Sequence, residues 1–233
     1  MRSPPRWREF VSPQALADEL GASVAGLLRR AIAAKGKAVI AVSGGTTPTR
    51  FFRVLSRQPL DWKSVIVTLV DERFVEPTTE RSNERLVRGT LLQAEARDAG
   101  FVPLFTPSAG VDAAAREASL RQQAIGPLDV AILGMGLDGH TASYFPDAEG
   151  IVALLDSGIE HDAVLAIEAP SAGELRLTQS LHRLAAARHV FLHIEGEEKK
   201  AVLHTALTAA EARAPVRRLL DAAPHGEIYW SPA

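Results

Sequence analysis

The sequence contains no cysteine among its 233 residues. Without thiols, a disulfide scaffold, a cysteine-ligated zinc or iron–sulfur site and thiol catalysis are excluded. Long apolar runs are missing as well, since no run approaches the roughly 18 residues of a membrane-spanning helix. The N-terminal segment MRSPPRWREF has no apolar stretch typical of a signal peptide. These absences fit a reducing compartment, and we expect a cytoplasmic chain without a membrane partner.

Neither sign of charge dominates the chain. It has 26 Lys and Arg residues against 28 Asp and Glu residues, so its formal net charge is −2. A protein whose main task is nucleic-acid binding usually carries a clear excess of basic residues. We therefore expect no nucleic-acid partner. Apolar residues make up 46% of the chain and charged residues 23%, which is the ordinary composition of a globular protein.

Short apolar runs alternate with segments of helical periodicity. Strands are predicted at residues 38–42, 65–70, 130–133, 164–167, 190–194 and 227–230. Helices are predicted over 13–35, 49–57, 82–95, 111–124, 178–187 and 197–212. The first helix has Ser12 as its N-cap and Gly36 at its end. Strands separated by helices predict parallel βαβ units and a doubly wound α/β sheet, and we expect residues 1–233 to form a single domain.

The first strand is followed by Ser43-Gly44-Gly45-Thr46-Thr47-Pro48. Ligands of such sheets bind outside the carboxyl ends of the strands, so this segment is a candidate site. Its glycines allow close approach to a ligand, and its hydroxyl groups and the following helix start favour a phosphate. It matches neither a Walker A nor a GxGxxG motif, so no nucleotide is implied. The alternative is an ordinary strand-to-helix turn.

The second strand is followed by Asp71-Glu72-Arg73. Carboxylates beside a guanidinium can orient water or a sugar hydroxyl and can clamp an anion. The alternative is a surface cluster of ion pairs. Further on, Ser82 or Asn83 is predicted to cap the next helix.

The third strand is followed by the glycine-rich segment Gly134–Pro146, GMGLDGHTASYFP. Asp138 and His140 lie two residues apart in it, a spacing that lets a carboxylate orient an imidazole. Histidine is the side chain most easily poised as a general base near neutral pH. The alternative is a structural histidine, which is less typical of such a loop. The other histidines, among them His161 and His193, are predicted to be structural or exposed, and no zinc site is predicted.

Two further cations follow later strands. Arg176 is predicted just before a helix, and Lys199 in the first turn of another helix, after Gly196. A lysine in that position could aim its ammonium group at a phosphate. The alternative is a solvated, charged helix end.

Taken together, these segments resemble the 6-phosphogluconolactonase family: SGGTTP, DER with SN, GMGLDGHTASYFP, RLT at Arg176–Thr178 and GEEK at Gly196–Lys199. The resemblance implies a Rossmann-like α/β/α fold. It also implies hydrolysis of 6-phosphoglucono-1,5-lactone in the oxidative pentose phosphate pathway, with no cofactor and no metal. The partner would be a small sugar phosphate, and the chain a monomer or small homo-oligomer.

The resemblance also assigns expected roles. His140 matches the general base that activates water, with Asp138 supporting it and Asp71 as the next candidate for the base. Arg73 matches an anion-binding or intermediate-stabilising arginine. The positions that line the substrate or its phosphate match Ser43, Gly44, Gly45, Thr46, Arg176 and Lys199. Which cation meets the phosphate stays open. Tyr144 stands where leucine is common, and we expect it to narrow or polarise the loop wall.

Two relatives of this family are the alternatives. Glucosamine-6-phosphate deaminase shares the glycine-rich turn and the DGH triplet, but it carries a glutamate where this chain has Phe145 and usually an aromatic residue where this chain has Arg73. A sugar-phosphate sensor domain of a transcription regulator usually carries an N-terminal helix-turn-helix, and we expect no space for one ahead of the first helix.

Overall fold

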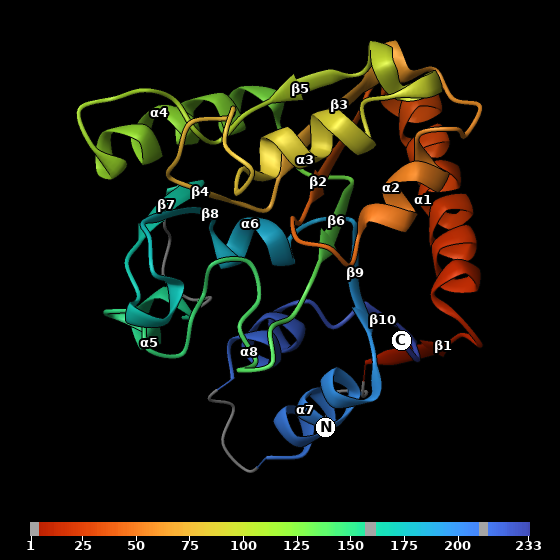
Figure 1. The fold of residues 1–233 in the computed structure, drawn as a ribbon. Coiled ribbons are helices and arrows are strands. Elements are labelled where there is room, and N and C mark those ends of the chain that lie inside the picture. Colours follow the sequence, from red (N-terminus) through yellow and green to blue (C-terminus); the bar gives the residue numbers. More distant parts are fainter. Residues whose placement is uncertain (1–4, 157–161, 210–213) are drawn as a thin grey trace.

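The computed structural model describes residues 5–156, 162–209 and 214–233 (Figure 1). Its largest element is a sheet of seven strands in the order β1-β10-β9-β6-β2-β3-β5, and every neighbouring pair is parallel. The strands are β1 (Arg6–Glu9), β2 (Ala38–Val42), β3 (Val65–Leu69), β5 (Gly100–Val102), β6 (Val130–Leu133), β9 (His189–Glu195) and β10 (Glu227–Ser231). The predicted parallel α/β fold is therefore confirmed.

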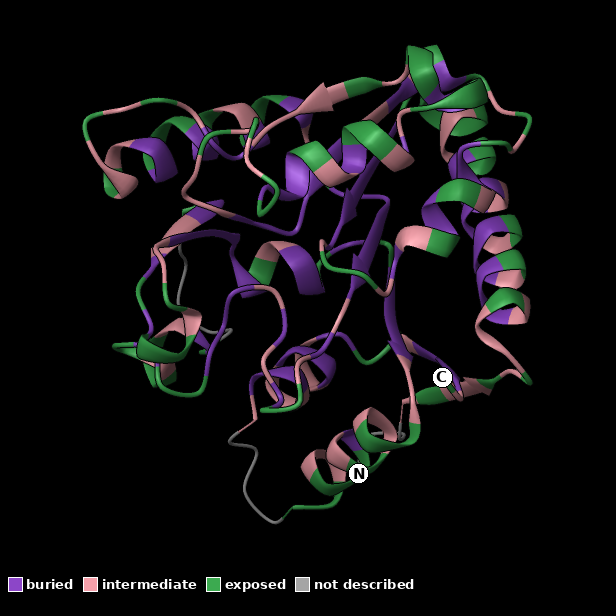
Figure 2. Ribbon diagram, viewed as in Figure 1, coloured by how far each residue is buried: buried purple, intermediate pink, exposed green. Residues whose placement is uncertain are grey.

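Helices cover both faces of this sheet. One face packs against α1 (Pro13–Lys35), α2 (Thr49–Leu55) and α3 (Asn83–Thr90). The other packs against α6 (Leu181–Ala185), α7 (Glu197–Thr208) and α8 (Pro215–Ala222). Figure 2 shows the central strands β2 and β6 buried between them, whereas the edge strands β1 and β5 are partly exposed.

The central strand β2 shows why the two faces form. All five of its residues are buried. Successive side chains of a strand point to opposite faces, so Ile40 and Val42 enter the core beside α1, whereas Val39 and Ala41 enter the core beside α8. An unbroken apolar run is thus buried on both sides, as expected for a parallel sheet.

The long helix α1 has the predicted ends. The hydroxyl oxygen of Ser12 accepts a hydrogen bond from the backbone N–H of Ala15 at 3.2 Å. Gly36 adopts a left-handed conformation with φ of 78° and donates its N–H to the carbonyl of Ile32. Glycine takes this conformation without a steric penalty, so it ends the helix there.

A second, antiparallel sheet has the order β4-β8-β7 and consists of Asp71–Arg73, Arg176–Gln179 and Val164–Ile167. The predicted strand at 164–167 exists, but its expected place in the parallel sheet was wrong. The helix expected over 178–187 begins only at Leu181, because residues 176–179 pair as β8. Arg176 therefore lies in a strand. The helix α4 (Val111–Ile125) packs against this small sheet, and α5 (Ile151–Leu154) follows the glycine-rich loop.

Several elements differ from the sequence prediction. The strands β1, β4, β5 and β8 and the helices α5 and α8 were not predicted. The helix expected over 82–95 ends at Thr90 and is followed by a short 3-10 turn at Ala94–Asp98. Part of the helix expected over 197–212 lies outside the described residues, and α7 ends at Thr208.

The strand order creates a switch point between β2 and β6. From β2 the chain moves outward to β3 and β5, and it then returns to the other side of β2 to form β6 and β9. The loops that leave the carboxyl ends of β2 and β6 therefore diverge, which opens a crevice where α/β proteins bind ligands. None of the helices in the described ranges is long and apolar enough to cross a membrane.

Candidate active site

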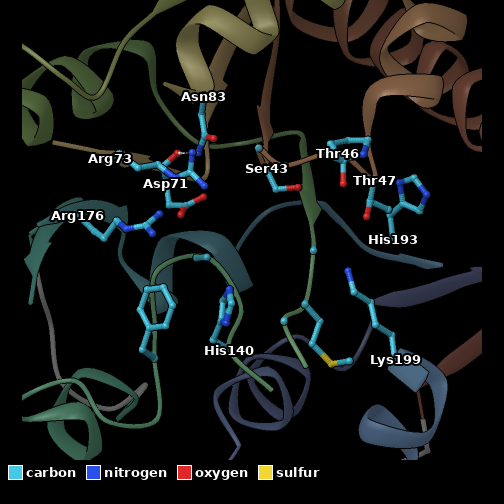
Figure 3. A pocket seen from close by; sticks show the side chains of 18 of the residues that line it. Ser43, Thr46, Thr47, Asp71, Arg73, Asn83, His140, Arg176, His193 and Lys199 are labelled. Carbon is cyan, nitrogen blue, oxygen red and sulfur yellow. Dashed lines mark hydrogen bonds between the residues drawn. The ribbon is translucent and has the colours of Figure 1, made fainter. Parts of the chain in front are cut away.

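A cavity of about 430 Å³ lies at this switch point (Figure 3). The loops after β2 and β6, the strands β4 and β8 of the small sheet, and the β9–α7 junction all reach it. It is lined by Ser43, Gly44, Gly45, Thr46, Thr47, Pro48, Asp71, Arg73, Asn83, Gly134, Met135, Gly136, His140, Ala142, Phe145, Ser171, Arg176, His193 and Lys199.

The turn after β2 is held against the small sheet by Asn83. A Cβ atom on Gly44 would lie only 1.8 Å from Oδ1 of Asn83, so only glycine allows this close approach. The Asn83 Nδ2 group donates to the backbone carbonyl of Asp71 at 2.8 Å. The predicted N-cap of α3 is Ser82, whose hydroxyl oxygen accepts from the backbone N–H of Arg85.

The loop after β6 presents His140 to the cavity. The Asp138 Oδ1 atom lies 2.6 Å from Nδ1 of His140 and accepts the His140 backbone N–H at 3.1 Å. Because a carboxylate only accepts hydrogen bonds, Nδ1 carries the proton, and Nε2 of the neutral ring keeps a free lone pair. A Cβ atom on Gly136 would lie 2.2 Å from Cε1 of His140, so this glycine makes room for the ring. The loop can thus present a base to a ligand.

The two ends of the Asp71-Glu72-Arg73 triplet line the cavity, while its middle residue does not. Asp71 accepts a hydrogen bond from the Ser143 hydroxyl at 2.6 Å. Arg73 lies directly opposite Arg176 in the antiparallel pairing of β4 with β8. Glu72 is fully buried and turns toward the start of α3.

The three cations of the cavity wall lie in two places. Figure 3 shows Arg73 and Arg176 beside Asp71, and Lys199 across the cavity near Thr46 and Thr47. Burial lowers the pKa of Arg176, while Asp71 opposes that shift; an arginine nevertheless stays charged. Burial also lowers the pKa of Lys199, and the carboxylate of Glu195 opposes this. An anionic ligand would therefore meet positive charge at both ends of the cavity.

The predicted site residues converge on this cavity. Asp138 alone among them does not line it, and it contacts His140 instead. Tyr144, which was expected to shape the loop wall, is fully buried and donates its hydroxyl to the carbonyl of Gln179 at 3.1 Å. That expectation was wrong, because the side chain points into the core.

Sequence reasoning missed several wall residues. His193 was predicted to be structural or exposed, yet it lines the cavity, with Nε2 lying 3.1 Å from Oε1 of Glu195. Its place near the end of a buried strand was the available signal. Phe145 lies in the glycine-rich segment Gly134–Pro146 but was weighed only as the position of the deaminase glutamate, and Ser171 had no signal in the sequence. His161 lies outside the described residues. Within those residues, no group of three or more His, Asp or Glu side chains could hold a metal ion.

Comparison with known proteins gives consistent matches over nearly the whole chain. Residues 11–230 match the family model described as glucosamine-6-phosphate isomerases/6-phosphogluconolactonase. A 6-phosphogluconolactonase of Mesorhizobium japonicum is 50% identical over 228 residues, which covers 97% of this chain and 95% of that protein. One of Rhizobium meliloti is 50% identical over 226 residues, covering 96% and 97%. The crystal structure of a 6-phosphogluconolactonase from Shewanella baltica has a TM-score of 0.90 at 35% identity and covers 99% of both chains.

Proposed function

The chain belongs to the family of glucosamine-6-phosphate isomerases and 6-phosphogluconolactonases, and from this premise we infer that it hydrolyses 6-phospho-D-glucono-1,5-lactone to 6-phospho-D-gluconate. That reaction is a step of the oxidative pentose phosphate pathway. The observation that carries the inference is the imidazole of His140, held at Nδ1 by Asp138 and facing a cavity lined by three cations. A sugar-phosphate substrate and a cytoplasmic location are parts of the same proposal.

His140 is the general base of this reaction. Its Nε2 atom takes a proton from a water molecule as the water oxygen bonds to the carbonyl carbon of the lactone. The bond from that carbon to the ring oxygen of the tetrahedral intermediate then breaks, and the imidazolium returns the proton to the ring oxygen. Asp138 keeps the ring in the required tautomer throughout. A lactone of this kind is an activated ester, so a positioned base and charge stabilisation suffice.

The arginine pair stabilises the oxygen on which negative charge develops. Like charges directly opposite each other in an antiparallel pair are destabilising, so Arg73 facing Arg176 favours an anion between them. The Nε atoms of both arginines are buried without a hydrogen-bond partner among the described residues. The Cζ atom of Arg176 lies 5.5 Å from the centre of the Phe145 ring, which in turn packs against His140. Arg176 is therefore on the side of the cavity where the base lies, and Arg73 faces Arg176 there.

The phosphate of the substrate binds at the other end, at Lys199. Its ammonium group faces the same cavity as the hydroxyl groups of Ser43, Thr46 and Thr47. A lysine ammonium and several hydroxyl donors form a common phosphate site. Lys199 lies at the end of the cavity away from His140, so it would hold the phosphate equally in the bound substrate and in the transition state.

The residue beside the base argues against the deaminase alternative. Deaminases carry a glutamate at the position of Phe145. Here the centre of the Phe145 ring lies 4.4 Å from the centre of the His140 ring. An aromatic ring cannot transfer a proton, so the carboxylate that the alternative would use there is absent from this position.

The test is an assay of lactone hydrolysis. The lactone is generated in place by glucose-6-phosphate dehydrogenase, and its disappearance is followed with and without the purified chain. We expect acceleration well above the spontaneous rate. A matched assay measures ammonia release from glucosamine 6-phosphate, for which we expect none. Hydrolysis no faster than in buffer would overturn the proposal, and ammonia release would favour the alternative.

A further inference from the structure

Phe145 is the feature that the proposed reaction does not use directly. Its side chain is 6% exposed and lines the cavity. The centres of the Phe145 and His140 rings are 4.4 Å apart and the ring planes meet at 33°. Close, tilted aromatic rings of this kind attract each other beyond the burial of their area. The ring therefore contacts the base rather than merely filling space beside it.

Two other contacts of His140 lie on the Nδ1 and Cε1 side of its ring. Asp138 bonds Nδ1, and the backbone of Gly136 lies against the Cε1 edge, where a Cβ atom would come within 2.2 Å of Cε1. A single hydrogen bond at Nδ1 still allows the imidazole to tilt about that contact, which would displace Nε2 on the opposite side of the ring. The face of Phe145 blocks this tilt. The position of the reactive nitrogen thus depends on an aromatic face as well as on a carboxylate.

Phe145 is itself held from outside the large sheet. Its side chain belongs to a small apolar cluster with the buried residues Ala148, Ile167 and Ala169 and the partly buried Leu165. Asp147 joins the two segments that carry this cluster, because its carboxylate accepts the Ser171 hydroxyl at 2.6 Å and the Ser171 backbone N–H at 2.9 Å.

Arg176 adds a functional reason for an aromatic residue at this position. Its Cζ atom lies 5.5 Å from the centre of the Phe145 ring, within the range of a cation–π contact. The same ring therefore contacts both the base and one of the cations of the cavity. During turnover His140 also becomes a cation, and the face of an aromatic ring stabilises a positive charge.

We propose that Phe145 is a positioning residue that fixes the imidazole plane of His140, and so the place of Nε2. The proposal rests on lactone hydrolysis with His140 as the base. An imidazole displaced by about 1 Å loses on the order of 100-fold in rate. Because the phosphate end of the cavity is untouched, the loss is expected in kcat and hardly in KM.

The test compares three variants in the lactone assay. Phe145→Leu keeps an apolar side chain but removes the aromatic face, and we expect kcat to fall about 10- to 100-fold with KM within about twofold. Phe145→Tyr keeps the face and should restore kcat to within about threefold of the wild type. Leu165→Ala is the matched control, because it loosens the same cluster without removing the ring, and it should leave kcat nearly unchanged.

Nuclear magnetic resonance of the unaltered chain separates this proposal from the proposed function. The ring current of an aromatic ring 4.4 Å away moves the ring-proton resonances of His140 upfield, whether or not the chain hydrolyses the lactone, and Phe145→Leu should abolish that shift. An inactive wild type that shows the shift would refute lactone hydrolysis but not the ring contact. Normal His140 resonances, a Phe145→Leu variant with wild-type kcat, or an equal loss in Leu165→Ala would each overturn the positioning role.

Discussion

The two sheets of the molecule differ in the side chains that their strands bring to the cavity. In the large sheet, the strands nearest the cavity are apolar and buried, as the run AVIAV in β2 illustrates. In the small sheet, the strands themselves carry charge, with DER in β4 and Arg176 in β8. The large sheet supplies the base and Lys199 from the segments that follow its strands, and His193 from β9 itself. The small sheet supplies Asp71, Arg73 and Arg176 directly from its strands.

Glu72 shows how the small sheet tolerates its charges. Its carboxylate is fully buried and accepts the backbone N–H groups of Arg73, Asn83 and Glu84 at 2.7, 2.8 and 2.7 Å, together with the Ser82 hydroxyl at 3.1 Å. Burial raises the pKa of Glu72, and these backbone hydrogen bonds oppose that shift. A buried carboxylate needs such partners, since an unsatisfied one is costly.

The largest effect is expected where a loop of the large sheet presents the base. His140→Ala should lower kcat about 100-fold or more, since general-base catalysis contributes about 10²–10⁴-fold. Neither sheet loses a packed core residue, so the melting temperature should stay within a few degrees of the wild type. Steady-state kinetics measure kcat, and calorimetry measures the melting temperature. Near-normal turnover would show that another residue is the base, with Asp71 as the next candidate.

A substitution in the core of the large sheet should lower the stability of the chain and leave its activity unchanged. Ile40→Ala removes a side chain with no exposed surface from β2, and such truncations cost about 2–5 kcal/mol of unfolding free energy. Urea denaturation measures that loss, and kcat and KM at low temperature should stay within about twofold of wild type. Val11→Ala, at a position that is 90% exposed, is the control and should change neither. A changed KM in Ile40→Ala would show that the core strands shape the site more directly than we infer.

A variant of the small sheet should change stability and activity together. Glu72→Ala removes the acceptor of three backbone N–H groups, and we expect a loss of about 2 kcal/mol in unfolding free energy. Because Arg73 and Asn83 lose their backbone anchor, kcat should fall as well, by about tenfold. Denaturation and kinetics on the same preparation measure both, with the exposed Glu80→Ala as control. A loss of stability with unchanged kcat would reduce Glu72 to a purely structural role.

The same contrast explains how far the sequence alone predicts this molecule. An apolar run such as 38–42 or 130–133 identifies a buried strand, because only a strand covered on both faces needs one. The strands β4 and β8 escaped prediction, because DER and RLTQ carry the charges of the site instead of an apolar pattern. A short run such as 164–167 also does not encode its partner, so its antiparallel pairing could not be foreseen.

The site was predictable wherever its chemistry directly follows a recognisable strand. The segments at Ser43, Asp71 and His140 all meet that condition, and they converge on one cavity. Ser171 reaches the cavity only because the segment between β7 and β8 folds over it, and Phe145, although it lies in the loop of His140, does so through its packing with that segment. Their contribution depends on tertiary packing, which local spacing does not reveal.

The cations at the two ends of the cavity should separate kinetically. Lys199→Ala should raise KM about tenfold with little change in kcat, since a phosphate contact acts equally in ground and transition states. Arg176→Ala should instead lower kcat, because it serves the developing oxyanion. Lys200→Ala is the matched control: its Nζ atom bonds Glu9 at 2.9 Å and lies 3.6 Å from the centre of the Trp230 ring. If Lys199→Ala lowered kcat and Arg176→Ala raised KM, the phosphate would bind at Arg176 and the oxyanion would form near Lys199.

The smallest expected effect is the pH dependence of phosphate binding. Burial lowers the pKa of Lys199, so its ammonium group loses its proton at a lower pH than an exposed lysine does. A phosphate monoester is already doubly charged above about pH 7, so only the protein titrates there. Calorimetric Kd values for 6-phosphogluconate should therefore weaken as the pH rises from about 8 to about 10, and at a lower pH than they would for an exposed lysine. Lys199→Arg keeps its charge over that range and should bind with nearly constant affinity. An equal weakening in Lys199→Arg would mean that another group titrates, and that the phosphate does not depend on this lysine.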